Sequence, residues 1–258
     1  DLAIVDLGAG PRLYAGGHRE VGQGSGPPEV WEFSGTTWTQ LPPLPGTSAS
    51  NGTGIFDLQA YTGQGTTALY AAGYFGDSFG GSHIARWDGS QWDDLQGGVY
   101  VTSGTFHYEA GIRTMQVHND GAGERLFVGG GFTGVAALSF PGQSSFVAAF
   151  DGANWEAVAA PSTSFDTVIR SFTEVEIGGG QRLVAAGDFT KGATANEDGL
   201  AQWDGSTWSS LPALPAGHGQ RRILHKYDFD GSGEQLIVGT VHLGPAQSID
   251  SSLLRLEG

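Results

Sequence analysis

The sequence predicts an all-β protein organised as a five-bladed β-propeller, and three observations carry this prediction. A hairpin pattern with an aromatic residue, an Asp-Gly or Ser-Gly pair and a tryptophan recurs at residues 30–41, 85–95, 147–158 and 200–211. Gly-x-Gly turns recur 53 to 58 residues apart. No segment shows sustained helical periodicity. A period of roughly 50 residues with four short strands per unit is typical of a propeller blade.

Each repeat starts with an apolar strand that ends at a tight turn, called the first turn here. The five first turns are Gly8-Ala9-Gly10, Gly63-Gln64-Gly65, Gly121-Ala122-Gly123, Gly178-Gly179-Gly180 and Gly231-Ser232-Gly233. Glycine is expected at these positions because tight hairpin turns need positive φ angles.

The second strand of each repeat ends in small residues, as in Leu69-Tyr70-Ala71-Ala72-Gly73. Small residues at a strand end predict that a neighbouring backbone approaches closely there. A longer segment follows, and three repeats place a phenylalanine at its equivalent start: Phe75, Phe132 and Phe189.

The third and fourth strands form the recurrent hairpin, as in Trp87-Asp88-Gly89-Ser90-Gln91-Trp92. Asp-Gly between aromatic residues is a strong hairpin signal, and the aspartate is explained by hydrogen bonds to the turn backbone. Residues 253–258 match only the first half of this pattern. We therefore predict four four-stranded blades and a last, three-stranded blade. The repeats span approximately 1–49, 50–106, 107–163, 164–217 and 218–258 of a single domain.

The first repeat resembles a kelch repeat in the Gly16-Gly17 doublet, the aromatic Trp31 and Phe33, and Trp38 followed by leucine and proline. Repeats two to four are also similar to secreted propeller repeats of bacterial and fungal cell-surface proteins, with a Gly-Gly-x-Phe-Thr and Trp-Asp-Gly-Ser-x-Trp pattern. Repeat two departs from it at Gly76, where the pattern has threonine. The resemblance covers the whole chain and implies a propeller, but no particular activity. Kelch propellers commonly have six or seven blades, so either a ring closes at five or the chain is part of a larger ring.

Composition and charge limit the partners that the protein can have. The 258 residues carry 12 Lys and Arg against 27 Asp and Glu, a formal net charge of −15, and no cysteine. Such a surface repels phosphate backbones and anionic lipids, so we expect no nucleic acid partner and no membrane insertion. The absence of cysteine excludes disulfides and thiolate metal sites. We expect an extracellular, cell-surface or periplasmic protein that is a monomer or part of a larger chain.

The variable long segments of the repeats are the best candidates for a binding site. Alternating up-and-down strands place these segments on one face, opposite the tight turns, and variable loops on a rigid scaffold usually carry function. Residues 75–83 and 96–111 are the richest in aromatic and histidine side chains, so we expect them to cluster. The candidate ligand-binding residues are Asp77, Phe79, His83, Tyr100, Phe106, His107 and Tyr108. Aromatic rings beside acidic groups suit a sugar or a peptide, although such rings can also simply cover the ends of the blades.

A calcium site is a weaker prediction at Asp228-Phe229-Asp230-Gly231-Ser232-Gly233. The candidate ligands Asp228, Asp230 and Ser232 alternate around a glycine turn, as in the calcium hairpins of integrin-type propellers. The last ligand position falls on Leu236, which has no carboxylate, so a structural turn is the better interpretation and we expect no cofactor otherwise.

The function that the sequence favours is a binding module that recognises a glycan or a protein through its long-segment face. An enzyme acting on glycans at that face, a hydrolase or a lyase, is one alternative, and a structural module of a larger surface assembly is another. An enzyme should bring carboxylates, or a histidine and a carboxylate, together in a pocket with shifted pKa values. No catalytic residue is predicted, because neither a nucleophile elbow nor a zinc-binding His spacing occurs.

Overall fold

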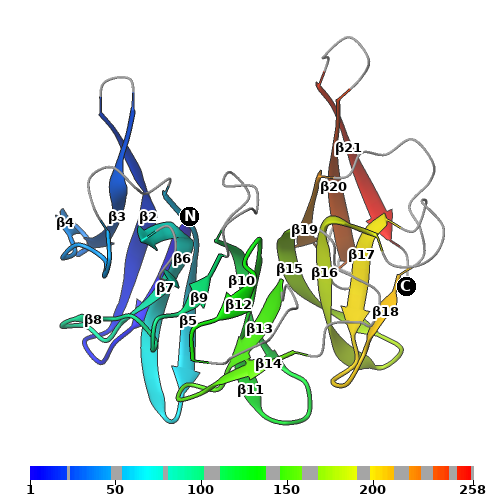
Figure 1. The fold of residues 1–258 in the computed structure, drawn as a ribbon, viewed down its shortest axis with the longest axis horizontal. Coiled ribbons are helices and arrows are strands. Elements are labelled where there is room, and N and C mark those ends of the chain that lie inside the picture. The colour runs from blue at the N-terminus through cyan, green and yellow to red at the C-terminus, as the bar shows by residue number, and fades with distance from the viewer. Residues whose placement is uncertain are drawn as a thin grey trace. The chain divides into compact units, whose positions relative to one another are not determined.

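The computed structural model shows an all-β chain with five antiparallel sheets in the described residues (Figure 1). It describes residues 1–21, 24–47, 54–77, 81–101, 111–137, 146–158, 168–190, 198–211, 221–227, 235–243 and 249–256. No helix occurs within these ranges.

In four of the five sheets of the described residues, neighbouring strands follow the order of the chain. The first contains β1 (Leu2–Asp6), β2 (Pro11–Val21), β3 (Gly24–Phe33) and β4 (Trp38–Gln40). The second contains β5 (Gly54–Gly63), β6 (Thr66–Asp77), β7 (Gly81–Trp87) and β8 (Trp92–Asp93), with β9 (Val99–Tyr100) and β12 (Gly134–Val135) added at its edge. The third contains β10 (Ile112–Asn119), β11 (Glu124–Gly130), β13 (Val147–Phe150) and β14 (Trp155–Ala157). The fourth contains β15 (Val168–Ile177), β16 (Gly180–Thr190), β17 (Asp198–Trp203) and β18 (Trp208–Ser210), and the fifth contains β19 (Arg221–Tyr227), β20 (Gln235–Leu243) and β21 (Ile249–Leu256).

The predicted hairpins are confirmed in all four complete repeats. The aromatic residues that flank each turn are directly opposite one another: Phe33 and Trp38, Trp87 and Trp92, Phe150 and Trp155, and Trp203 and Trp208. Their ring centroids are 5.0 to 5.4 Å apart, the spacing of stabilising aromatic pairs. In one turn, Asp88 Oδ1 accepts hydrogen bonds from the Ser90 and Gln91 amides at 2.7 and 2.9 Å. The bond from Gln91 is the largest of the causes that lower the pKa of Asp88. These hydrogen bonds explain why an aspartate precedes the turn glycine.

The second sheet has two more strands than predicted. Two strands, β9 and β12, come from stretches that the sequence pattern assigned to loops, and they extend the sheet beyond β7. Both are two residues long, so they have too few residues to show the alternation by which a strand is recognised in a sequence.

The chain divides into two compact units. The first comprises Asp1–Val117 and Arg125–Ala157, and the second comprises His118–Glu124 and Val158–Gly258. The turn between β10 and β11 thus belongs to the second unit.

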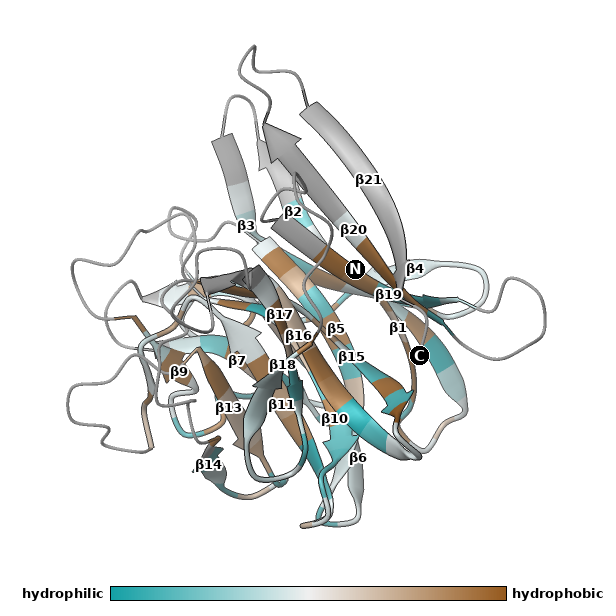
Figure 2. Ribbon diagram, turned by 90° about the vertical axis from the view of Figure 1, so that its right-hand side faces the viewer, coloured by the Kyte–Doolittle hydropathy of each residue, from teal (hydrophilic) through white to brown (hydrophobic). Residues whose placement is uncertain are grey.

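Each sheet has two distinct faces, named here by the side chains of its second strand. The leucine face carries Leu13, Leu69, Leu126, Leu183 or Leu236, and the opposite face carries the next residue, as Tyr14 and Tyr70 do. In the first unit, Leu69 and Trp87 of the second sheet share a buried core with Val5 and Tyr14 of the first sheet. In the second unit, Leu224 and Leu236 of the fifth sheet share a core with Val184 and Leu200 of the fourth. In each of these two pairs a leucine face packs on the opposite face of the preceding sheet. Figure 2 shows apolar stretches within the strands.

A polar side chain near the start of the first strand joins neighbouring sheets at equivalent positions. These bonds run from Leu58 N to Asp1 Oδ2 at 2.9 Å, from Met115 N to Asp57 Oδ2 at 2.6 Å, and from Leu224 N to Ser171 Oγ at 3.1 Å. Each acceptor satisfies a backbone amide that the sheet ladder leaves available. Burial raises the pKa of Asp57 to about 6, although the bond from Met115 opposes this shift.

Glycines allow two kinds of close backbone contact. A Cβ on Gly73, Gly130 or Gly187 would lie 2.1 Å from a carbonyl oxygen of the first strand or of the residue preceding it, so the predicted close approach is confirmed. The predicted strand end is confirmed only at Gly130, because β6 and β16 continue beyond Gly73 and Gly187. Hairpin-turn glycines also meet the first turn of the preceding sheet. A Cβ on Gly152 would lie 2.5 Å from Gly63 Cα, and one on Gly205 would lie 2.5 Å from the Asp120 carbonyl oxygen.

Candidate functional site

Three of the predicted ligand-binding residues, Asp77, His83 and Tyr100, lie in the described part of the chain. Asp77 ends β6 and is directly opposite Gly81 of β7. The other four, Phe79, Phe106, His107 and Tyr108, lie outside the described residues, as do the candidate calcium ligands Asp228, Asp230 and Ser232.

The two long segments that the sequence pattern singled out do meet at the edge of the second sheet. Ser82 of β7 is directly opposite Val99 of β9, and the Ser82 amide donates to the Gly97 carbonyl at 2.8 Å. A Cβ on Gly98 would lie 2.1 Å from the Ser82 carbonyl oxygen, so the two backbones touch. The structure therefore brings residues 81–83 and 97–101 together, as we expected.

His83 is buried at this edge of the sheet and hydrogen-bonds to the backbone of the preceding strand. Its side chain is buried, with 2% of the residue exposed, and its Nδ1 accepts a hydrogen bond from the Phe75 amide at 3.3 Å. Its ring stacks on Tyr74 with centroids 5.3 Å apart and an interplanar angle of 11°. His83 thus fixes the position of the Phe75 backbone. Because its side chain is buried, it is not itself placed to contact a ligand.

The backbone at this edge is strained. Ser82 has a φ of 111° and His83 a φ of 48°, both in the region that residues other than glycine rarely adopt. Such conformations persist only where surrounding contacts enforce them, and they are most common at functional sites. Here the bonds of Ser82 to Gly97 and of His83 to Phe75 enforce them.

Tyr100 is partly exposed, unlike His83. It is partly buried on β9, directly opposite Gly134 of β12, and its carbonyl accepts from the Thr133 amide at 2.9 Å. A Cβ on Gly134 would lie 2.4 Å from the tyrosine hydroxyl, so the ring lies across the bare backbone of this glycine. Sequence reasoning missed Gly134, and its signal would have been a glycine two residues after the recurrent Phe132.

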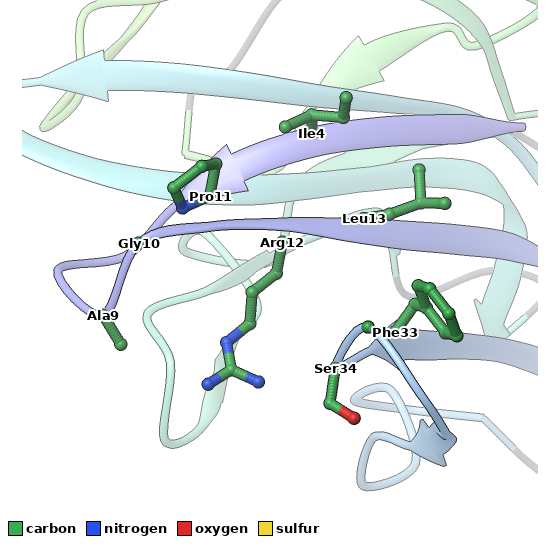
Figure 3. Close-up of a pocket in the computed structure, with 9 residues that line it drawn as sticks. Ile4, Ala9, Gly10, Pro11, Arg12, Leu13, Phe33 and Ser34 are labelled. Atoms are coloured by element: carbon green, nitrogen blue, oxygen red, sulfur yellow. The ribbon is translucent and has the colours of Figure 1, made fainter.

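A second feature, a hollow on the first sheet, was not predicted from the sequence. It has a volume of about 500 Å³ and is lined by Ile4, Ala9, Gly10, Pro11, Arg12, Leu13, Phe33, Ser34 and Gly35 (Figure 3). Ile4, Leu13 and Phe33 lie side by side on β1, β2 and β3. The hollow therefore opens on the leucine face, between the first turn and the hairpin turn.

One residue that lines the hollow, Arg12, belongs to a hydrogen-bonded group within the first sheet. Arg12 Nη1 lies 2.7 Å from Glu32 Oε1, and the Tyr14 hydroxyl donates to Glu32 Oε2 at 3.1 Å. Burial and the Glu32 charge raise the pKa of Tyr14 to about 12. Arg12, the charged residue of the lining, is thus paired within its own sheet, and Ile4, Leu13 and Phe33 supply the apolar part of the hollow.

Neither metal-binding groups nor membrane-spanning helices are found in the described ranges. No three His, Cys, Asp or Glu side chains come close enough there to share a metal ion. Within the same ranges, no helix is long and apolar enough to cross a membrane.

Comparison with known proteins does not assign the chain to a family. No family model matches it, and no curated protein is similar enough to count as a match. The kelch-like resemblance therefore remains a prediction from the sequence pattern.

Proposed function

We propose that the five sheets are blades of a five-bladed β-propeller and that the protein is a binding module, extracellular or on a cell surface, that recognises a glycan. The blade interpretation is supported by equivalent contacts between successive sheets, namely the bonds to Asp1, Asp57 and Ser171. The hairpin-turn glycines Gly89, Gly152 and Gly205 also each contact the first turn of the preceding sheet. Equivalent contacts at a constant repeat are what radial stacking of similar sheets requires.

One observation carries the binding proposal: the long segments of the second repeat meet at a strained, tightly bonded edge of the sheet. A rigid scaffold that holds a partly exposed tyrosine beside a variable segment suits stacking on a sugar ring. In this proposal Tyr100 contacts the glycan, and His83 and Gly134 position it.

The test is binding of the purified chain to an array of neutral and acidic oligosaccharides. Tyr100→Ala should weaken a detected interaction by about tenfold or more, because a stacking ring is lost. Tyr227→Ala is the matched control, because it removes an exposed tyrosine from a different sheet. Equal loss in both variants, or binding that does not depend on Tyr100, would count against this site.

An array without any binding would contradict the glycan proposal and leave a protein partner as the alternative. An enzyme of glycan chemistry would instead turn over an oligosaccharide that binds, which product analysis by mass spectrometry would detect.

A further inference from the structure

Strand register places Asp77 and Tyr100 in one row across the second sheet. Asp77 of β6 is directly opposite Gly81 of β7. Ser82 of β7 is directly opposite Val99 of β9. One residue further along this antiparallel pair, Gly81 lies beside Tyr100. Two residues that the sequence pattern singled out for binding thus lie two strands apart, with one glycine between them.

Tyr100 belongs to the face of the sheet opposite the core of the first unit. Val99 of β9 and Val135 of β12 are directly opposite one another and fully buried in that core. Side chains alternate between the two faces along a strand, so Tyr100 and its partner Gly134 belong to the other face. The Tyr100 ring leans over Gly134, on the side of β9 that is turned away from β7. The ring therefore leaves the backbone of Gly81 uncovered.

The length of this row sets the size of the ligand that can follow it. Two strand spacings, about 10 Å, separate the backbones of Asp77 and Tyr100. Gly81 stands between them and has no side chain, so a ligand can approach the sheet closely there. One sugar ring stacked on Tyr100 is too short to reach Asp77, whereas a disaccharide or a longer oligosaccharide laid across the strands spans the row.

The charge of the surrounding segments favours uncharged sugars. Residues 75–83, 96–111 and 131–146 contain the carboxylates Asp77 and Glu109 and no Lys or Arg, in a chain with a formal net charge of −15. A sugar that carries a carboxylate or a sulfate would meet like charge from these segments. The hydroxyl groups of a neutral sugar can instead donate hydrogen bonds to an aspartate, and such charge-assisted bonds are strong.

We propose that the ligand is a neutral oligosaccharide of at least two sugar units that lies across this row, with one unit stacked on Tyr100 and the next donating hydrogen bonds to the Asp77 carboxylate. The inference rests on the proposed function, because it takes Tyr100 as the stacking residue. It adds the class of glycan and assigns Asp77 as the residue that determines specificity. The same carboxylate that attracts hydroxyl groups repels anionic groups, which is how one residue can discriminate between two ligands.

Isothermal titration calorimetry of the purified chain tests the size and charge of the ligand. The probes are glucose, galactose and mannose, disaccharides of these sugars, and the same disaccharides with one terminal sugar oxidised to the uronic acid. A neutral disaccharide should bind about tenfold or more tightly than its monosaccharide and than its acidic form, because only it gains the bonds to the carboxylate. A monosaccharide or an acidic form that binds as tightly, or the absence of binding to every neutral probe, overturns the proposal.

Variants of Asp77 separate this inference from the stacking site itself. Asp77→Ala should weaken binding of the neutral disaccharide by about tenfold or more and leave monosaccharide binding unchanged, because only the disaccharide reaches this residue. Asp77→Asn retains an oxygen that accepts from a hydroxyl but has no charge, so it should bring the affinities for the neutral and acidic forms several-fold closer together.

Glu176→Ala and Glu176→Gln are the matched controls, because they remove one exposed carboxylate from β15 of the fourth sheet. Equal effects of the Glu176 and Asp77 variants would trace the selectivity to the net charge of the chain and overturn the role of Asp77. Disaccharide binding that depends on Tyr100 but not on Asp77 also overturns this inference, and it leaves the proposed function intact. Binding that does not depend on Tyr100 overturns both.

Discussion

The first and second sheets carry similar apolar side chains at equivalent positions, yet their leucine faces differ in exposure. Leu2, Leu13 and Phe33 of the first sheet correspond to Leu58, Leu69 and Trp87 of the second. In the second sheet all three are buried, whereas in the first they are exposed or partly exposed. The alternation of side chains forms the strand in both cases, but only a neighbouring sheet makes the face part of a core.

Replacing the matched leucines should give the largest difference between the two sheets. Leu58→Ala should lower the free energy of unfolding by about 3 kcal/mol, because it leaves a cavity in a packed core, and Leu2→Ala by less than about 0.5 kcal/mol. Urea denaturation at low protein concentration measures both. Equal losses would mean that the two faces are equally covered under those conditions.

The same comparison shows what could be predicted from the sequence. The hairpins, the first turns and the close approach of Gly73 follow from local rules, because turn chemistry and alternation act within a few residues. The burial of His83, the β9 and β12 strands and the hollow beside Gly35 depend on contacts between distant segments. The meeting of residues 81–83 with 97–101 could be expected because both belong to repeat two and its junction with repeat three.

The hairpin-turn glycines extend this comparison of the sheets to their turns. Gly35 and Gly152 have φ angles of 96° and 97°, so alanine at either position should cost about 1 kcal/mol through backbone strain. Gly152→Ala should cost about 1 to 2 kcal/mol more, because its Cβ would lie 2.5 Å from Gly63 Cα. Thermal unfolding of both variants checks this difference, and an equal shift in Tm would show that the turns do not press on each other.

Asp57 tests the polar contact at a covered interface through its pH dependence. Its pKa is about 6 in the folded chain against 3.8 as the ordinary value, so the folded state holds the proton more tightly. The free energy of unfolding contributed by this group should therefore be highest below pH 4 and fall as the pH rises to about 6. The expected loss is about 2 kcal/mol, less than the full shift implies because Asp57 is only partly buried.

Asp57→Asn isolates this contribution. Asparagine retains an oxygen that can accept from the Met115 amide, but it has no charge to bury. We expect the variant to be more stable than the parent at pH 7 and equally stable near pH 4. Urea denaturation at each pH gives the difference in the free energy of unfolding between the variant and the parent. The contributions of the other carboxylates are the same in both proteins, so they cancel in this difference. A difference that does not change with pH would show that Asp57 is not buried by the third sheet.

The tryptophans of the fourth strands should show the smallest effect, and they test whether each covered sheet is bonded to its predecessor. Trp155 Nε1 donates to the Leu95 carbonyl at 3.0 Å in a buried position, whereas Trp38 of the first sheet is 44% exposed on the open face. Trp155→Phe keeps an aromatic ring beside Phe150 but leaves the Leu95 carbonyl without this donor, so it should cost about 1 to 2 kcal/mol. Trp38→Phe keeps its ring pair with Phe33 and should change stability by less than about 0.5 kcal/mol at low concentration. Equal costs for Trp38→Phe and Trp155→Phe would show that the indole hydrogen bond does not distinguish the two sheets.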